Sequence, residues 1–176
     1  MKNYKWKILM RTTLLCIMIL AFTLNSKAQQ ANFSGTWKLN IEKSDFGNVP
    51  SRAAVQSYQV EQGKEEMSLK WTTKNEANEE VASAPQKLLL DSTPATTLLL
   101  SQRTRVISAK FSSNGKSLLI SKSISKPNSP KEVDYVLKET WQLINSGKDL
   151  LIELTSPSYV IKAVYEHPGL SIEMKE

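Results

Sequence analysis

The stretch ISAKFSSNGKSLLISK, residues 107–122, decides the fold class of this chain. Apolar and polar residues alternate on both sides of the Asn-Gly dipeptide at 114–115, which is typical of a tight β-hairpin turn. A two-residue turn at this point sets apolar positions opposite apolar positions, as a strand pair with one buried face requires. The resulting pairs are Phe111 with Leu118, Ala109 with Ile120, and Ile107 with Lys122.

A second hairpin is predicted around the Ser-Gly dipeptide at 146–147. A two-residue turn there pairs Leu143 with Leu150 and Trp141 with Ile152, so apolar positions meet again. It also pairs Glu139 with Leu154, which places one carboxylate among the alternate positions that otherwise carry apolar residues (the apolar parity).

Period-two alternation recurs along most of residues 33–166, and no long window repeats apolar residues at helical spacing. Regular spacing of short strands indicates a sandwich or a barrel, and we expect an all-β, antiparallel up-and-down meander barrel of about eight to nine strands. The segments 97–101 and 104–112 form either two strands or one bent strand. The expected strands are 34–41, 53–62, 66–74, 86–91, 97–101, 104–112, 116–124, 133–144, 148–155 and 159–166.

Three longer segments between these strands carry turn-forming residues. Residues 45–52 are expected to form a loop or one short helical turn, and the polar stretch 75–85 a mobile loop or a brief helix. A loop with two prolines is expected at 126–132.

The first 28 residues have the layout of a secretory signal peptide. A positive segment, 2–11, precedes an apolar run of 11 residues at 14–24, and small residues occupy positions −3 and −1 of a cut after Ala28. The alternative, a membrane anchor, needs roughly 20 apolar residues. We therefore predict a signal peptide at 1–28, one domain at 29–176, and an exported protein that is periplasmic or extracellular, with no stable membrane insertion after cleavage.

The charge of the chain lies mainly in this leader. The whole chain has a net charge of +6, but the leader holds five of the 23 basic residues and no acidic one, which leaves a net +1 for residues 29–176. Nucleic-acid binding requires a basic surface, so we expect no nucleic-acid partner.

Residues 29–176 lack most of the side chains that carry catalysis or bind metals. The single cysteine, Cys16, lies in the leader, and His167 is the single histidine, which we interpret as a loop residue. A metal site needs clustered His, Cys, Asp or Glu, and a serine-based mechanism needs a positioned base. The chain has no nucleotide-binding glycine motif either. We expect neither an enzyme nor a metal or other cofactor.

Three charged residues interrupt the apolar parities of the predicted strands. Arg105, Lys122 and Glu139 share the parity that otherwise carries large apolar residues, and a pairing that sets Lys122 opposite Glu139 is allowed. One hypothesis is a polar cluster inside the barrel that orients the polar end of a ligand. The alternatives are a bulge that reverses the parity, or solvated positions at the open rim.

The tryptophans of the predicted strands also lie on apolar parities, where they either pack in the core or form the wall of a cavity. We expect the interior to include Phe111, Ile120 and Ile152 in addition to these tryptophans. The predicted ligand-binding residues are Trp37, Trp71, Arg105, Lys122, Glu139 and Trp141.

Two leucine runs break the alternation, Leu88-Leu89-Leu90 and Leu98-Leu99-Leu100. Both faces of these stretches are apolar, so each is expected to be covered on both sides, for example by a loop. The alternative is an exposed patch that binds a partner in the cell envelope.

Two segments carry a resemblance to a known family. Residues 33–40 (FSGTWKLN), followed by KSDFG at 43–47, resemble the opening of small secreted bacterial lipocalin-like (calycin-type) proteins. ETWQL at 139–143 resembles a later strand of the same group. The resemblance implies an up-and-down barrel whose cavity holds small apolar molecules.

The motif Gly35-x-Trp37 matches the first barrel strand of lipocalins, in which the tryptophan closes one end of the barrel. Lipocalins stack a late arginine on this tryptophan, but residues 106–176 contain no arginine. Lys162 is the candidate replacement, although a lysine stacks less well than a planar guanidinium.

These observations predict an exported, non-enzymatic binding protein for a small hydrophobic or amphipathic ligand held in a β-barrel cavity. The alternative is a cell-envelope interaction module with a filled barrel or sandwich and no small-molecule ligand. A cavity of roughly 300 Å³ or more favours the first function.

Overall fold

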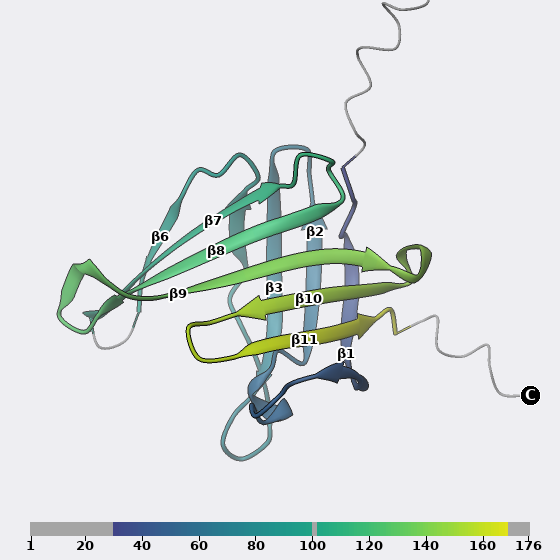
Figure 1. Ribbon diagram of the computed structural model, residues 1–176, viewed down its shortest axis with the longest axis horizontal. Helices are drawn as coiled ribbons and strands as arrows, with labels where there is room; N and C mark the ends of the chain where they lie inside the picture. The colour runs from purple at the N-terminus through teal and green to yellow at the C-terminus, as the bar shows by residue number, and fades with distance from the viewer. Residues whose placement is uncertain (1–29, 100–101, 169–176) are drawn as a thin grey trace, which may run out of the picture.

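The computed structural model describes residues 30–99 and 102–168, so the predicted signal peptide lies outside the described residues. Eleven strands form one antiparallel sheet, and the short 3₁₀ turns η1 (Ser51–Ala53) and η3 (Asn145–Gly147) interrupt it (Figure 1). The predicted fold class, an all-β antiparallel up-and-down meander barrel, is confirmed, but the sheet has eleven strands rather than the eight to nine expected, because β4 and the separate strand β6 add to it. The strands are β1 Gly35–Asp45, β2 Ser57–Gln62, β3 Glu66–Lys74, β4 Glu80–Ala82, β5 Gln86–Leu89, β6 Ala95–Leu98, β7 Thr104–Phe111, β8 Ser117–Lys126, β9 Ser129–Ile144, β10 Asp149–Thr155 and β11 Val160–Glu166.

Pairing between the first and the last strand closes the sheet into a barrel. The strand order is β4-β3-β2-β1-β11-β10-β9-β8-β7-β6, with β5 paired to β3. On the opposite side, β5 and β7 are joined by a single bridge between Asp91 and Lys110 and by one backbone hydrogen bond, from Ser92 N to Ala109 O at 2.9 Å. The barrel is therefore closed by a ladder between β1 and β11 on one side and by a narrow seam between β5 and β7 on the other.

Both hairpin registers predicted from the sequence are confirmed. Phe111 lies opposite Leu118, and Leu143 lies opposite Leu150. The loops are longer than two residues: the Ser112 N–H donates to Ser117 O at 2.8 Å and so closes the first of them. The register survives because residues are added equally on both sides of the turn.

Two segments predicted as loops contain strand. The stretch 75–85 includes the short strand β4, which pairs with the end of β3. Strand β9 begins at Ser129, and the register between β8 and β9 shifts near this point. Pro130 lies in this irregular part of the ladder, where its missing N–H removes no regular hydrogen bond. The segments 97–101 and 104–112 give two strands, β6 and β7, rather than one bent strand.

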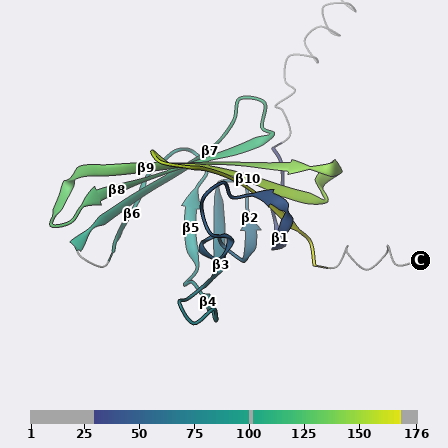
Figure 2. The same ribbon diagram turned by 60° about the horizontal axis from the view of Figure 1, so that its bottom comes forward.

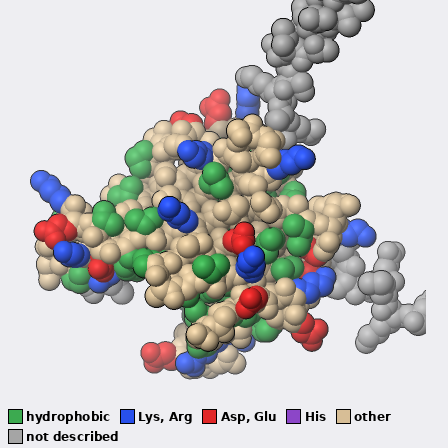
Figure 3. All heavy atoms as spheres, viewed as in Figure 1, with side chains coloured by type: hydrophobic (Ala, Val, Ile, Leu, Met, Phe, Trp, Pro, Cys, Tyr) green, Lys and Arg blue, Asp and Glu red, His purple; other side chains and the backbone are tan. Residues whose placement is uncertain are grey.

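The ends of β6, β7, β8 and β9 project beyond the rest of the barrel (Figure 2). Two large apolar side chains are strongly exposed on these strands, Leu98 (74%) and Val133 (58%). In the space-filling view, apolar side chains gather along this projection, next to charged side chains at its tip (Figure 3).

The leucine runs are not covered on both sides as expected. Leu88 and Leu90 are buried, whereas Leu89 between them is 43% exposed, because successive strand residues point to opposite faces. Leu98 is exposed and Leu99 faces the interior, while Leu100 lies outside the described residues. The described leucines therefore form no continuous exposed run.

Large side chains fill the end of the barrel that carries the turns between β2 and β3 and between β7 and β8. Phe33 is completely buried there, and its ring stacks on Phe111 at 6.3 Å and meets the edge of Trp141 at 6.1 Å. The side chain of Gln62 fixes this segment, because it accepts the Phe33 N–H at 2.9 Å and donates to Ala31 O at 2.9 Å. We call this region the filled end.

Both residues of the Gly35-x-Trp37 motif contact His167, which follows the last strand. The Trp37 ring stacks on His167 with centroids 3.8 Å apart, and its Nε1–H donates to Phe33 O at 2.9 Å. Gly35 has a φ of +137°, and a Cβ there would lie 2.5 Å from His167 Cε1. Glycine is therefore required by the backbone conformation and by the space that His167 occupies.

The expectation that Lys162 replaces the lipocalin arginine was wrong. Lys162 is exposed and lies 2.9 Å from Glu153 on the outer face of the sheet. His167, interpreted from the sequence as a loop residue, follows β11 directly, and its Nδ1 lies 2.9 Å from Thr36 O. The contact with Thr36 O orients the imidazole so that it lies against the Trp37 ring.

We expect Gly35→Ala to lower the free energy of unfolding by about 2–3 kcal/mol, because alanine strains the backbone and displaces His167. Gly63→Ala is the matched control: the nearest atom to its added Cβ is Glu66 O at 3.4 Å, and we expect a change within about 0.5 kcal/mol. Urea unfolding measures both. Equal stability of the two variants would contradict the role of Gly35.

Candidate functional site

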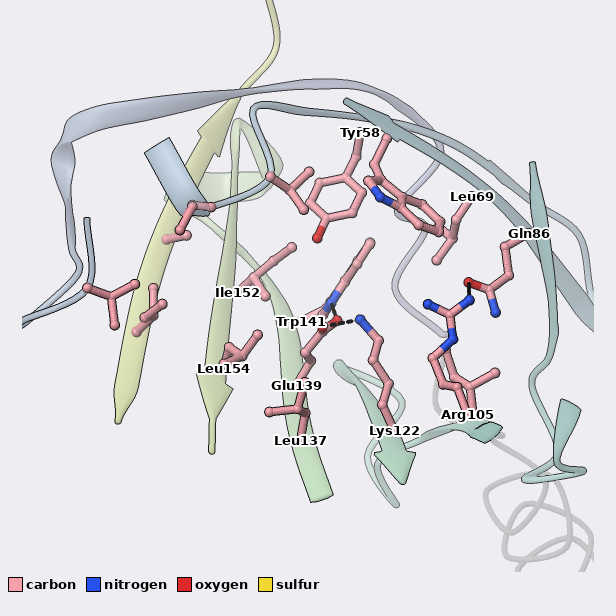
Figure 4. A pocket seen from close by; sticks show the side chains of 18 of the residues that line it. Tyr58, Leu69, Gln86, Arg105, Lys122, Leu137, Glu139, Trp141, Ile152 and Leu154 are labelled. Atoms are coloured by element: carbon pink, nitrogen blue, oxygen red, sulfur yellow. Dashed lines mark hydrogen bonds and ion pairs between the residues drawn. The ribbon is translucent and has the colours of Figure 1, made fainter. Parts of the chain in front are cut away.

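A cavity of 340 Å³ occupies the half of the barrel opposite the filled end (Figure 4). Its wall is mainly apolar and comes from strands on all sides of the barrel. A second part of the wall comes from the connection between β1 and β2, around η1. The apolar lining residues are Val49, Ala53, Ala54, Val55, Leu69, Trp71, Leu99, Ile107, Ile124, Leu137, Trp141, Ile152, Leu154, Ile161 and Ala163.

The connection between β1 and β2 is anchored to the barrel from two sides. The Tyr165 hydroxyl donates to Val55 O at 3.1 Å, while the Gln56 side chain donates to Ala54 O at 2.7 Å within the connection itself. The Gln56 N–H also donates to Thr72 O at 2.8 Å. This segment was predicted as a loop or a short helical turn, and η1 confirms the short turn.

The predicted polar cluster lies inside the barrel. Lys122 and Glu139 form an ion pair in which the Glu139 side chain is only 3% exposed and that of Lys122 is 24% exposed. The second Glu139 oxygen accepts the Trp141 Nε1–H at 3.1 Å. Both oxygens of this buried carboxylate are therefore bound, as the high cost of an unpaired buried charge requires.

Arg105 stands apart from this ion pair. Its Nη2 lies 3.5 Å from Gln86 Oε1, a neutral partner at the outer limit of a hydrogen bond. The Arg105 Nε–H is buried and has no hydrogen-bond partner among the described residues. The cavity therefore holds a guanidinium with donor capacity that the described residues leave unused (Figure 4).

The register explains why the three charged side chains lie on the same inner face of the barrel. Lys122 lies opposite Leu137 rather than opposite Glu139, and it reaches Glu139 as the diagonal neighbour on the same face. Arg105 lies opposite Ile124, which makes it the diagonal neighbour of Lys122 on the other side. The irregular register between β8 and β9 comes after Ile124, so it does not reverse the parity of these residues.

The predicted ligand-binding residues divide into two groups. Trp71, Arg105, Lys122, Glu139 and Trp141 line the cavity. Trp37 is buried but does not line it, since its ring packs against His167. Of the other expected interior residues, Ile152 lines the cavity, whereas Phe111 and Ile120 belong to the core without lining it.

Two tyrosines of the site were missed in the sequence. Tyr58 meets Trp141 at 5.0 Å and Tyr165 at 5.2 Å, both edge to face, and its hydroxyl points into the cavity (Figure 4). Burial raises the pKa of Tyr58 well above its usual value, and the nearby Tyr165 and Glu139 raise it further. Burial and Glu139 also raise the pKa of Tyr165. Both phenols therefore stay protonated and can act as hydrogen-bond donors. Tyr58 and Tyr165 share the alternation of the inward-facing Val60 and Ala163, and this pattern was the sequence signal that could have identified them.

The described residues contain no group of three or more His, Cys, Asp or Glu side chains that could hold a metal ion. Within residues 30–99 and 102–168, no helix is long and apolar enough to cross a membrane.

Comparison with known proteins identifies the fold. No family model and no curated protein matches the sequence. The wild-type fluorescent protein UnaG matches the structure with a TM-score of 0.54 and 16% identity, over 77% of this chain and 96% of that chain. The REP1-NXSQ fatty acid transporter matches with a TM-score of 0.52 and 11% identity, over 76% of this chain and 94% of that chain. The chain shares the barrel fold of these two proteins.

We expect Lys122→Met to destabilise the protein, because it leaves Glu139 buried without its cation. Breaking a fully buried pair costs about 3–5 kcal/mol, and the partial exposure of Lys122 lowers our expectation to about 2–3 kcal/mol. The double variant Lys122→Met/Glu139→Gln should recover more than half of this loss.

Urea unfolding measures these changes, with Lys162→Met as the surface control. Lys162 and Glu153 form an exposed pair on the outer face, so this control should leave the free energy of unfolding essentially unchanged. A Lys122→Met variant as stable as the control would show that the buried pair contributes nothing.

Proposed function

We propose that this chain is an exported, non-enzymatic binding protein for a small amphipathic molecule. The observation that carries the proposal is the arginine in the apolar cavity, whose buried Nε–H has no partner among the described residues. A cavity of 340 Å³ lies within the range of about 300–1,000 Å³ that is usual for small-molecule sites.

The apolar tail of the ligand lies against the strands on the far side of the cavity from Arg105. Ile152, Leu154 and Ile161 form this part of the wall. Removal of apolar surface from water gives about 25 cal/mol per Å², so the tail supplies most of the affinity. The connection between β1 and β2 covers one side of the tail.

The polar end of the ligand lies at Arg105. A guanidinium presents a planar set of N–H donors that matches a carboxylate in two parallel hydrogen bonds. The structural similarity to a fatty acid transporter supports an alkyl carboxylate as the first ligand class to test. The phenol of Tyr58 offers a further hydrogen-bond donor to the ligand.

The lining residues favour binding over catalysis. Among the described residues that line the cavity there is no Ser, Thr, Cys or His to act as a nucleophile or a base. The one carboxylate, Glu139, is held by Lys122 and Trp141. No cofactor is needed for this function.

The alternative function is an interaction module of the cell envelope that holds no small molecule. The exposed Leu98 and Val133 on the projecting strands favour a partner there. The cavity and its arginine favour the carrier function, because a filled barrel needs neither. We therefore place the carrier function first.

We expect the purified protein to bind decanoate, and Arg105→Met to weaken this binding by at least about tenfold, since a charged hydrogen bond contributes about 1.5–3 kcal/mol. Isothermal titration calorimetry measures both dissociation constants. Lys110→Met, on the outward face of the same strand, is the control and should bind as the wild type does. Equal binding by all three proteins would contradict the role of Arg105.

We also expect the protein recovered from an exporting host to begin at Gln29. Intact-mass measurement and N-terminal sequencing of the exported fraction test this cleavage. An Ala28→Arg variant places a large charged residue at position −1 and should accumulate with its leader attached. Export of a chain that still begins at Met1 would contradict the signal peptide.

A further inference from the structure

The cavity has an uneven distribution of charge. Its charged lining residues among the described part of the chain are two cations, Arg105 and Lys122, and one carboxylate, Glu139. Glu139 forms its ion pair with Lys122, not with Arg105. Arg105 has only the neutral amide of Gln86 beside it. The net charge of the cavity is therefore +1, and it is located on one guanidinium.

We infer that Glu139 sets the charge class of the ligand: it neutralises Lys122, so the cavity selects amphiphiles whose head carries a single negative charge over those with two or none. This inference rests on the proposed binding function and adds to it a specificity-determining residue. Glu139 acts through Lys122 and needs no contact with the ligand.

The physical basis is the cost of uncompensated charge in an apolar cavity. A monoanion beside Arg105 leaves the site neutral. A dianion leaves one negative charge unbalanced, and a neutral head leaves the guanidinium unbalanced. Charges in such surroundings are costly unless they are paired and hydrogen-bonded, so both mismatched classes bind more weakly.

The diagonal arrangement gives Lys122 a second possible partner. Lys122 is the diagonal neighbour of Glu139 on one side and of Arg105 on the other. Glu139→Gln removes the charge that holds Lys122, and the freed ammonium lies beside the guanidinium on the same face. Two adjacent cations match a dianionic head, so the substitution should move the preference from monoanions to dianions.

Glu139→Gln is a conservative way to change this charge. A glutamine has nearly the same shape, and its Oε1 can still accept the Trp141 Nε1–H that Glu139 Oε2 accepts now. The hydrogen bond to Trp141 is thus retained while the negative charge is lost.

The test compares three probes with the same ten-carbon chain, each below its micelle concentration: decanol, decanoate and decyl phosphate. At pH 8 the phosphate monoester is mainly dianionic, since its second pKa is about 6. Calorimetry gives the dissociation constants for the wild type, Glu139→Gln, and the control Glu153→Gln, whose carboxylate lies on the outer face.

The wild type and Glu153→Gln should bind decanoate at least about tenfold more tightly than decyl phosphate or decanol. Glu139→Gln should shift the phosphate-to-carboxylate ratio by at least about tenfold towards the phosphate. The double variant Lys122→Met/Glu139→Gln should return to the wild-type preference, because Arg105 is again the one cation of the site.

The outcomes separate the inference from the proposed function. Failure of the wild type to bind any of the three probes overturns the binding function and the inference with it. Binding with the same ratio in the wild type and Glu139→Gln overturns the inference alone. A Glu139→Gln shift that persists in the double variant also overturns it, since the released Lys122 is then not the cause.

A measurement on the wild type keeps the inference falsifiable if Glu139→Gln does not fold. Lowering the pH from 8 to 5.5 converts decyl phosphate mainly to its monoanion. Its affinity relative to decanoate should then rise by at least about fivefold. A ratio that stays constant across this pH range overturns the inference.

Discussion

The antiparallel ladder between β1 and β11 is the constraint on which the rest of this structure depends. Register pairs such as Leu39 with Tyr165 join the two ends of the meander, so the sheet has an inside and an outside. Lys43 reinforces this ladder by pairing with Glu166 beside the buried Asp149, and its hydrogen bond lowers the pKa of Glu166. Once the sheet is closed, strand alternation assigns every second side chain to the interior.

The interior created in this way is divided unequally. Aromatic and aliphatic side chains fill one half, where Phe33 packs between Phe111 and Trp141. The other half keeps a cavity and three charged residues, which contribute less to stability than packed apolar residues of the same size. A protein selected for stability alone gains nothing from an arginine with an unused buried donor. The filled half therefore supplies the stability that the cavity half lacks.

Much of this barrel could be predicted from the sequence, because alternation and turn residues act over short distances. The pairs Phe111 with Leu118 and Leu143 with Leu150 follow from the positions of two turns. The inward orientation of Lys122 follows from the first of these turns, because Lys122 lies an even number of residues from Leu118. The remaining features depend on long-range packing. The stacking of His167 on Trp37, the diagonal partner of Lys122 and the size of the cavity arise only after closure, which local patterns do not encode.

The contact between Thr36 and His167 spans 131 positions of the chain. The first barrel strand therefore meets its final neighbour only after nearly the whole chain has been made, and every partly synthesised chain has open strand edges. Long-range pairing of this kind slows folding, and open edges invite aggregation. The architecture thus favours closure only at full length, because a chain that ends before β11 keeps β2 as a neighbour of β1 but leaves the other edge of β1 unpaired.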